Sequence, residues 1–160
     1  MSIGAALAGG FAGTLVLTTV LRAASELRMT RMDLPFLLGT AVTSDRARAK
    51  AVGYLAHFGF GFVFALGYWW LFSSVGHAGW VLGALFGVAH AAFATTALVT
   101  VLLPVVHPRM GTSFTAAGSA PLLEPPGFLM LNYGAGTPVV TLVAHVAYGA
   151  IVGAFIAAAR

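Results

Sequence analysis

The chain has 160 residues, of which 59% are hydrophobic and only 8% charged, and its mean hydropathy is +0.94. A water-soluble domain of this size could not cover its surface with so few charges, so the composition predicts an integral membrane protein. The formal net charge of +4 does not indicate a nucleic-acid partner, because the basic residues mostly flank apolar segments. Cysteine is absent, which excludes disulfides and thiolate metal sites.

The first predicted membrane span is residues 3–28, which begins with a long run without charge. About 20 apolar residues are enough to cross a bilayer core of about 30 Å. Because the basic residues follow this run and do not precede it, we expect a retained helix and not a signal peptide. Ala5, Gly9 and Gly13 recur every four residues and form a small face suited to close helix packing.

A polar connection with the sequence MDLPFLLGT leads to the second span, residues 45–73. Pro35 near the start of this sequence and Gly39 at its end predict a short interfacial helix. Ser44 or Asp45 is expected to cap the second span. An aromatic cluster at the far end of that span is typical of a membrane interface.

The third and fourth predicted spans are residues 78–104 and 137–159, separated by a long loop over 107–136. Small residues recur every four positions along the third span and predict a close contact with another helix, in the same chain or in a second copy. The fourth span shows the same spacing. The glycines with this predicted packing role are Gly9, Gly13, Gly79, Gly83, Gly87, Gly149 and Gly153.

The predicted fold class is therefore all-α. We expect a single transmembrane domain over residues 1–160, with a bundle of four transmembrane helices, a short interfacial helix after the first, and a long loop before the last. Seven basic residues lie at the first and third connections and one lies at the opposite end: Arg22, Arg28, Arg31, Arg46, Arg48, Lys50 and Arg109 against Arg160. The positive-inside rule then places both connections in the cytoplasm and both termini outside.

Three histidines fall within the predicted spans, where an ionisable side chain is costly and marks a candidate site by default. Counted from Lys50 and Pro138, His57 and His145 each lie seven residues into their helices, a depth of about 10 Å. Because these helices run in the same direction, both imidazoles are expected to face the bundle interior near one another, with His90 deeper. The candidate intramembrane polar residues are His57, His145, His90, Thr18 and Thr19.

Two interpretations of this set stay open. Either each histidine bonds a neighbouring backbone carbonyl or threonine hydroxyl and holds helices together, or the histidines form a ligand or proton-handling site. Imidazole is a common metal ligand, but no HExxH motif is present and no carboxylate lies within a span, so metal binding stays unknown and no catalytic residue is predicted. His77 and His107, at the span ends, are expected to be solvated.

The order of several short blocks resembles a group of small bacterial four-helix membrane proteins classed as domain-of-unknown-function families. The blocks are MDLPFLLGT, AHFGFGFVFALGY, GALFGVAHAAFA, HPRMG, PPGFLMLNYG and AHVAYGAIVGA, and together they cover most of the chain. The resemblance implies four helices in a bacterial inner membrane. It implies no activity and no catalytic residues.

Three functions from different classes are compatible with the sequence. The favoured hypothesis is a structural or accessory membrane protein, in contact with the lipid bilayer and packing as a homodimer or within a larger membrane complex. The second is a small transporter or proton-linked permease that uses the histidine layer. The third is a redox subunit in which His57 and His145 ligate haem. The sequence favours a protein without enzymatic activity and names no other cofactor.

Overall fold

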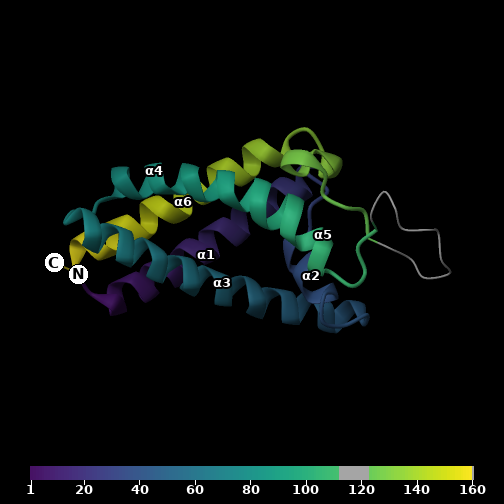
Figure 1. The fold of residues 1–160 in the computed structure, drawn as a ribbon, viewed down its shortest axis with the longest axis horizontal. Coiled ribbons are helices and arrows are strands. Elements are labelled where there is room, and N and C mark those ends of the chain that lie inside the picture. The colour runs from purple at the N-terminus through teal and green to yellow at the C-terminus, as the bar shows by residue number, and fades with distance from the viewer. Residues whose placement is uncertain (112–122, 160) are drawn as a thin grey trace.

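The computed structural model describes residues 1–111 and 123–159, and the regular structure of this part of the chain is helical. Within these residues, four helical rods are long and apolar enough to cross a membrane (Figure 1): α1 (Ile3–Glu26), α3 (Arg46–Val75), the rod Trp80–Val106, and α6 (Thr137–Ala158). The predicted all-α class with four apolar helices is thus confirmed. Arg160 and the part of the predicted loop over 112–122 lie outside the described residues.

Most helix ends follow local signals in the sequence. Asp45 caps α3, since its carboxylate accepts a hydrogen bond of 2.8 Å from the backbone N–H of Arg48. The short helix α2 (Leu34–Thr40) is present where it was expected, and Asp33 caps it in the same way. The first span ends at Glu26, two residues before the predicted boundary. Arg28 has a φ of 59°, a left-handed conformation that cannot continue an α-helix.

The third rod is not a uniform α-helix. It consists of α4 (Trp80–Phe93), the π-helical segment η1 (Ala94–Leu102) and α5 (Leu103–Val106). Thr95 and Thr96 donate side-chain hydrogen bonds to the carbonyls of Ala91 and Ala92, which compete with the regular backbone ladder where α4 gives way to η1. Pro104, which has no N–H to donate, follows directly. The π-helical segment η1, which has more residues per turn than an α-helix, lies between the threonine hydrogen bonds and Pro104.

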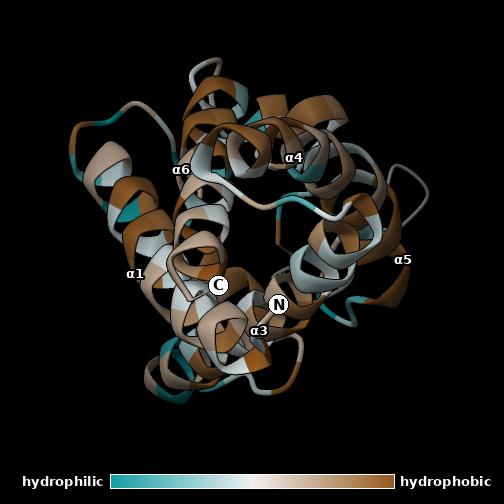
Figure 2. Ribbon diagram, turned by 90° about the vertical axis from the view of Figure 1, so that its left-hand side faces the viewer, coloured by the Kyte–Doolittle hydropathy of each residue, from teal (hydrophilic) through white to brown (hydrophobic). Residues whose placement is uncertain are grey.

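The helices form an up-and-down bundle in which α6 lies between α1 and α4 and packs against both (Figure 2). Helix α3 packs against α1 and, near its start, against α2. The chain ends and the turn between α3 and α4 lie at one end, and the two long connections lie at the other (Figure 1). Near the turn, α3 and α4 meet through rings: the Tyr68 and Phe86 centroids are 6.0 Å apart, and those of Phe72 and Phe86 are 5.3 Å apart.

The predicted small-residue face of the third span packs within the same chain. A Cβ on Gly83 would overlap the carbonyl oxygen of Gly149, and one on Gly87 would overlap the carbonyl oxygen of His145. Gly9 and Gly13 of α1 face α6 as well, with Gly9 against Val152 and Phe155 and Gly13 against Tyr148. Close contact of α6 with α4 and α1 therefore depends on these glycines, and it needs no second copy of the chain.

The described part of the long connection closes the end of the bundle opposite the termini. Its 3-10 helix η2 (Phe128–Tyr133) buries Met130, which is 1% exposed, and the backbone N–H of Arg31 donates to the carbonyl of Tyr133 at 2.7 Å. The Thr30 and Thr137 hydroxyls are hydrogen-bonded at 2.7 Å, which joins the start of α6 to the segment after α1. This end is a packed cap over the bundle.

His107 lies in this cap and is buried, so the prediction that it is solvated is wrong. Its Nδ1 accepts from the backbone N–H of Arg109 at 3.1 Å, which leaves the proton on Nε2. Nε2 then donates to the carbonyl of Leu37 at 3.0 Å, with the Thr40 hydroxyl at 3.3 Å. Both ring nitrogens have partners because the chain turns back over α2 after α5. His77, in contrast, is exposed as predicted.

Candidate functional site

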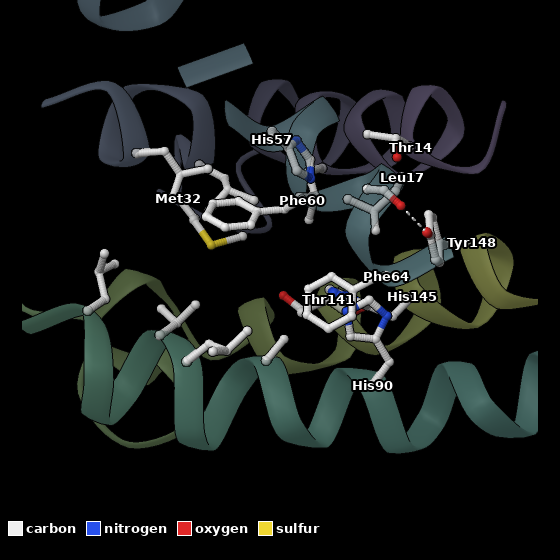
Figure 3. Close-up of a pocket in the computed structure, with 18 of the residues that line it drawn as sticks. Thr14, Leu17, Met32, His57, Phe60, Phe64, His90, Thr141, His145 and Tyr148 are labelled. Carbon is white, nitrogen blue, oxygen red and sulfur yellow. Dashed lines mark hydrogen bonds between the residues drawn. The ribbon is translucent and has the colours of Figure 1, made fainter. Parts of the chain in front are cut away.

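A cavity of about 260 Å³ runs from the middle of the bundle toward the cap. All four rods and α2 contribute to its walls. The volume exceeds the ~150 Å³ of an engineered apolar protein cavity that stays dry and binds benzene. It is therefore large enough for a small molecule or for part of a lipid chain. Figure 3 shows its inner part, with His57 on one wall and His90 with His145 on the other.

The polar groups of the cavity gather at its inner end. They come from four helices and comprise Thr14, His57, His90, Thr141, His145 and Tyr148. His57 and His145 are each 8% exposed and belong to α3 and α6, and both side chains line the same space. The sequence placed these two residues at one level, and the structure brings them to opposite walls of one cavity (Figure 3).

The hydrogen bonds of the two histidines define which ring nitrogen carries the proton. Nδ1 of His145 lies 2.8 Å from the carbonyl of Thr141 and therefore donates. The Thr18 hydroxyl donates to the carbonyl of Thr14 at 2.6 Å, so its oxygen accepts from Nδ1 of His57 at 3.3 Å. In both rings Nε2 is then the unprotonated nitrogen, and it makes no hydrogen bond with a described residue.

His90 does not lie deeper than the other two, as the sequence predicted, but beside His145. The two ring centroids are 4.6 Å apart with an interplanar angle of 83°. The Phe64 ring packs on the His90 ring, with 3.9 Å between their centroids. The prediction counted depth from Pro104, whereas the third rod has 27 residues against 22 in α6. The extra length lies at the cap end, so a count from that end overestimates the depth of His90.

The two threonines predicted with the histidines have different positions. Thr18 bonds His57 as described, whereas Thr19 is exposed on α1 and donates only to the carbonyl of Leu15 in its own helix. Thr141 was not predicted. It lies four residues before His145 and therefore on the same helix face, a spacing that could have identified it in the sequence.

Besides the two Nε2 atoms, two fully buried polar groups at the inner end have no hydrogen-bond partner among the described residues. They are the hydroxyl of Thr141, which is 3% exposed, and Nδ1 of His90. A buried hydroxyl without a partner costs roughly 1–3 kcal/mol, which a ligand or an ordered water in the cavity would recover. In Figure 3 the Thr141 oxygen points into the cavity. The inner end is therefore a polar site with unused hydrogen-bonding capacity.

The rest of the cavity is apolar and opens between α3 and the third rod. Its wall on that rod comes largely from η1 and α5, including Leu98 and Val99. Phe60, Leu102 and Val106 line the cavity and are each at least half exposed on the outer surface. These residues mark a lateral mouth on the apolar outer face of the bundle.

None of the described residues that line the cavity is Asp, Glu, Lys or Arg. In the described part of the chain, no group of three His, Asp or Glu side chains converges to hold a metal ion. On its other side, His57 borders a separate crevice of about 20 Å³ near Arg22, Ser25 and Asp33. That space holds about one water molecule and places His57 between the apolar cavity and the polar cap.

Nothing matches this chain among protein-family models, curated proteins or solved structures. The resemblance to small bacterial four-helix proteins therefore stays a prediction.

Proposed function

We propose that this protein is a membrane protein that binds a neutral, lipid-like molecule in the cavity between α3 and the third rod. The supporting observation is an apolar cavity, open on the apolar outer side of the bundle, whose inner end holds a buried Thr141 hydroxyl that has no partner among the described residues. A pocket of mostly apolar walls with a few convergent polar groups is the usual form of a small-molecule site. The mouth admits molecules from the bilayer, so the ligand is one that the bilayer dissolves.

The balance of forces in a bilayer places selectivity at the polar end. An acyl or isoprenoid chain gains little hydrophobic energy on leaving lipid for the cavity, because lipid tails are as apolar as leucine. Filling otherwise empty space adds dispersion contacts for any chain that fits. The discriminating interactions are hydrogen bonds to the polar groups at the inner end, each contributing roughly 0.6–2 kcal/mol within a membrane.

The accessory, haem-binding and proton-transport hypotheses make different demands on the cavity from those of lipid binding. An accessory role needs only the packing surfaces and leaves the cavity without a purpose. Haem ligation by His57 and His145 would bring two propionates to a cavity whose described lining has no Lys or Arg. The absence of a Soret band from protein purified from its native membrane would remove this hypothesis.

Proton-linked transport is favoured by the crevice behind His57, because His57 borders both the cavity and this crevice near the polar cap.

Placement in the membrane follows from charge. The basic residues from the end of α1 to the start of α3 lie at the cap end, which supports an orientation with the cap inside, α2 at the interface and both termini outside. That the membrane is a bacterial inner membrane is what the resemblance to small bacterial four-helix proteins implies. The chain has no cysteine, so single cysteines can be labelled without background. Ala47→Cys, at the cap end, should resist a membrane-impermeant maleimide in intact cells, and Val75→Cys at the other end should react. The reverse pattern would overturn the orientation.

Ligand binding is tested by extracting the protein with its surrounding lipid in polymer nanodiscs and identifying the bound organic-soluble molecules by mass spectrometry. Leu98→Trp fills the cavity from η1, and Leu85→Trp places the same side chain on the outer surface of α4, where Leu85 is 61% exposed. We expect one molecular class to be enriched over the bulk lipid in the wild type and in Leu85→Trp, and lost from Leu98→Trp. Equal lipid profiles for all three proteins would contradict the proposal.

A further inference from the structure

We infer that the ligand's head is an uncharged hydroxyl group, so that the cavity selects long-chain or isoprenoid alcohols over ethers, ketones and acids with the same chain. This inference rests on the proposed function and adds the chemistry of the head. It is carried by the inner end of the cavity, where two imidazole acceptors and one hydroxyl donor, beside Nδ1 of His90, have no hydrogen-bond partner among the described residues.

The acceptors are the Nε2 atoms of His57 and His145. Each ring has its proton on Nδ1, because that nitrogen donates to the Thr18 hydroxyl in one case and to the Thr141 carbonyl in the other. An unprotonated Nε2 can only accept a hydrogen bond. The ligand atom that meets either nitrogen must therefore carry a proton.

The donor is the hydroxyl of Thr141. Its oxygen is buried and makes no hydrogen bond with a described residue, although its own backbone carbonyl is occupied by His145. Thr141 and His145 are four residues apart on α6, so their polar groups share one helix face. A ligand oxygen that accepts from Thr141 while its proton goes to a histidine satisfies both sides of the site. An alcohol does this with one atom, whereas an ether or ketone oxygen can accept but cannot donate.

The walls restrict the charge of the head. Phe60 and Leu102 line the mouth, Leu98 also lines the cavity, and no described lining residue is charged. A carboxylate or phosphate would lose its hydration here without finding a cation, at a cost of several kcal/mol. A hydroxyl has a far smaller penalty, and the hydrogen bonds at the inner end offset it. Phospholipids with ionised heads are therefore excluded as ligands that bind head first.

The test compares four molecules with one saturated chain: the primary alcohol, its methyl ether, the corresponding methyl ketone and the carboxylate. Each is added to the protein in nanodiscs, and the dissociation constant is measured as a partition between protein and lipid, with the radiolabelled molecule as the probe. We expect the alcohol to bind roughly five- to thirtyfold more tightly than the ether or ketone, the range for one or two intramembrane hydrogen bonds. The carboxylate should not bind measurably.

Variants assign the preference to the site. His57→Leu and His145→Leu should lower the affinity for the alcohol toward that for the ether and leave the ether unchanged, whereas His77→Leu, on the exposed turn, should alter neither. Equal affinities of wild-type protein for alcohol and ether would overturn the hydroxyl inference and leave the proposed function intact. Binding of none of the four would overturn both. Because the ratio is measured first on the wild type, a variant that fails to fold does not decide the outcome.

Discussion

Gly83 and Gly149 face each other across the α4–α6 interface so closely that a Cβ atom on either would overlap the carbonyl oxygen of the other. The relationship is reciprocal, which means that two backbones are in direct contact over this turn. In a membrane, where the hydrophobic effect between helices is absent, such contact maximises dispersion and allows weak hydrogen bonds from Cα–H groups. The same interface fixes His145 on α6 against Gly87 and so aligns it with His90 on α4.

Gly83→Ala is expected to separate α4 from α6, because the obstructing atoms are backbone and cannot rotate away. Overpacking of this kind costs roughly 1–3 kcal/mol. Gly67→Ala is the matched control: Gly67 lies in α3, and a Cβ there would meet no atom within 4 Å. The Gly67→Ala substitution should stabilise α3 by up to about 1 kcal/mol, because alanine favours a helix more than glycine does. Thermal unfolding in detergent measures both, and equal midpoints would show that close α4–α6 contact does not stabilise the bundle.

Much of the architecture could be predicted from the sequence because its signals are local. Span lengths follow from uncharged runs, the Asp45 cap from residue type, and the glycine faces from four-residue spacing. The partner of each glycine face could not be predicted, since spacing on one helix does not say which other helix approaches. Likewise, the sequence identified His57 and His145 as a set but not the cavity between them, which depends on how far α3 and the third rod diverge.

The predictions for His90 and His107 fail for the same physical reason. The depth of His90 and the solvation of His107 were both inferred from distance along the chain to a helix end. Distance along the chain does not show that the third rod extends past α6, which changes the depth of His90. It also does not show that the connection after α5 folds back over α2, which buries His107. The π-helical segment η1 was missed because α- and π-helices of apolar residues have no distinguishing composition.

His107→Leu is expected to release the cap from α2. The substitution leaves the Leu37 carbonyl and the Arg109 N–H without their partner, and each buried group left unpaired costs roughly 1–3 kcal/mol. Limited proteolysis should then cut the segment after α5 faster than in the wild type. His77→Leu, at the exposed turn, should leave the cleavage rate unchanged. The same rate for both variants would mean that the hydrogen bonds of His107 do not hold the cap.

Stability of the cap should fall in alkaline solution because of Tyr133. Burial and the neighbouring Glu124 carboxylate raise the pKa of its phenol to about 12, and the hydroxyl donates to the Glu124 carbonyl at 2.8 Å. In the unfolded chain the tyrosine phenol ionises at about pH 10. A raised pKa means that the folded state keeps its proton longer, so the contribution of Tyr133 is complete below about pH 10 and declines above it.

The decline is measured as the unfolding free energy against pH in chemical denaturation, and it should be on the order of 1 kcal/mol between pH ~10 and ~11. Tyr133→Phe removes the titrating group and should flatten this part of the curve, although it also loses the hydrogen bond at all pH values. A wild-type curve with the same slope as that of Tyr133→Phe would contradict the assignment.

Tyr148 joins α6 to α3 at the inner end of the cavity: its hydroxyl donates to the Gly61 carbonyl at 2.6 Å (Figure 3). The ring is 1% exposed, and Gly61 is the residue that leaves room for Thr14 on the opposite helix α1. In Tyr148→Phe the ring packing is kept and only the hydrogen bond is lost, so we expect destabilisation of about 0.6–1.7 kcal/mol, the range for such bonds within membranes. Tyr54→Phe, at a residue 38% exposed on α3, is the control and should have no measurable effect.

The substitution also separates two roles of the inner end. If the Tyr148 hydroxyl serves only to hold α3 in place, Tyr148→Phe lowers the unfolding midpoint, and the alcohol-to-ether affinity ratio stays within about twofold of the wild type. That is the expected result, because the proton of Tyr148 is already used by Gly61 and the acceptors at the inner end are imidazoles. A ratio that falls toward one, with little loss of stability, would instead identify Tyr148 as the group that binds the ligand's head.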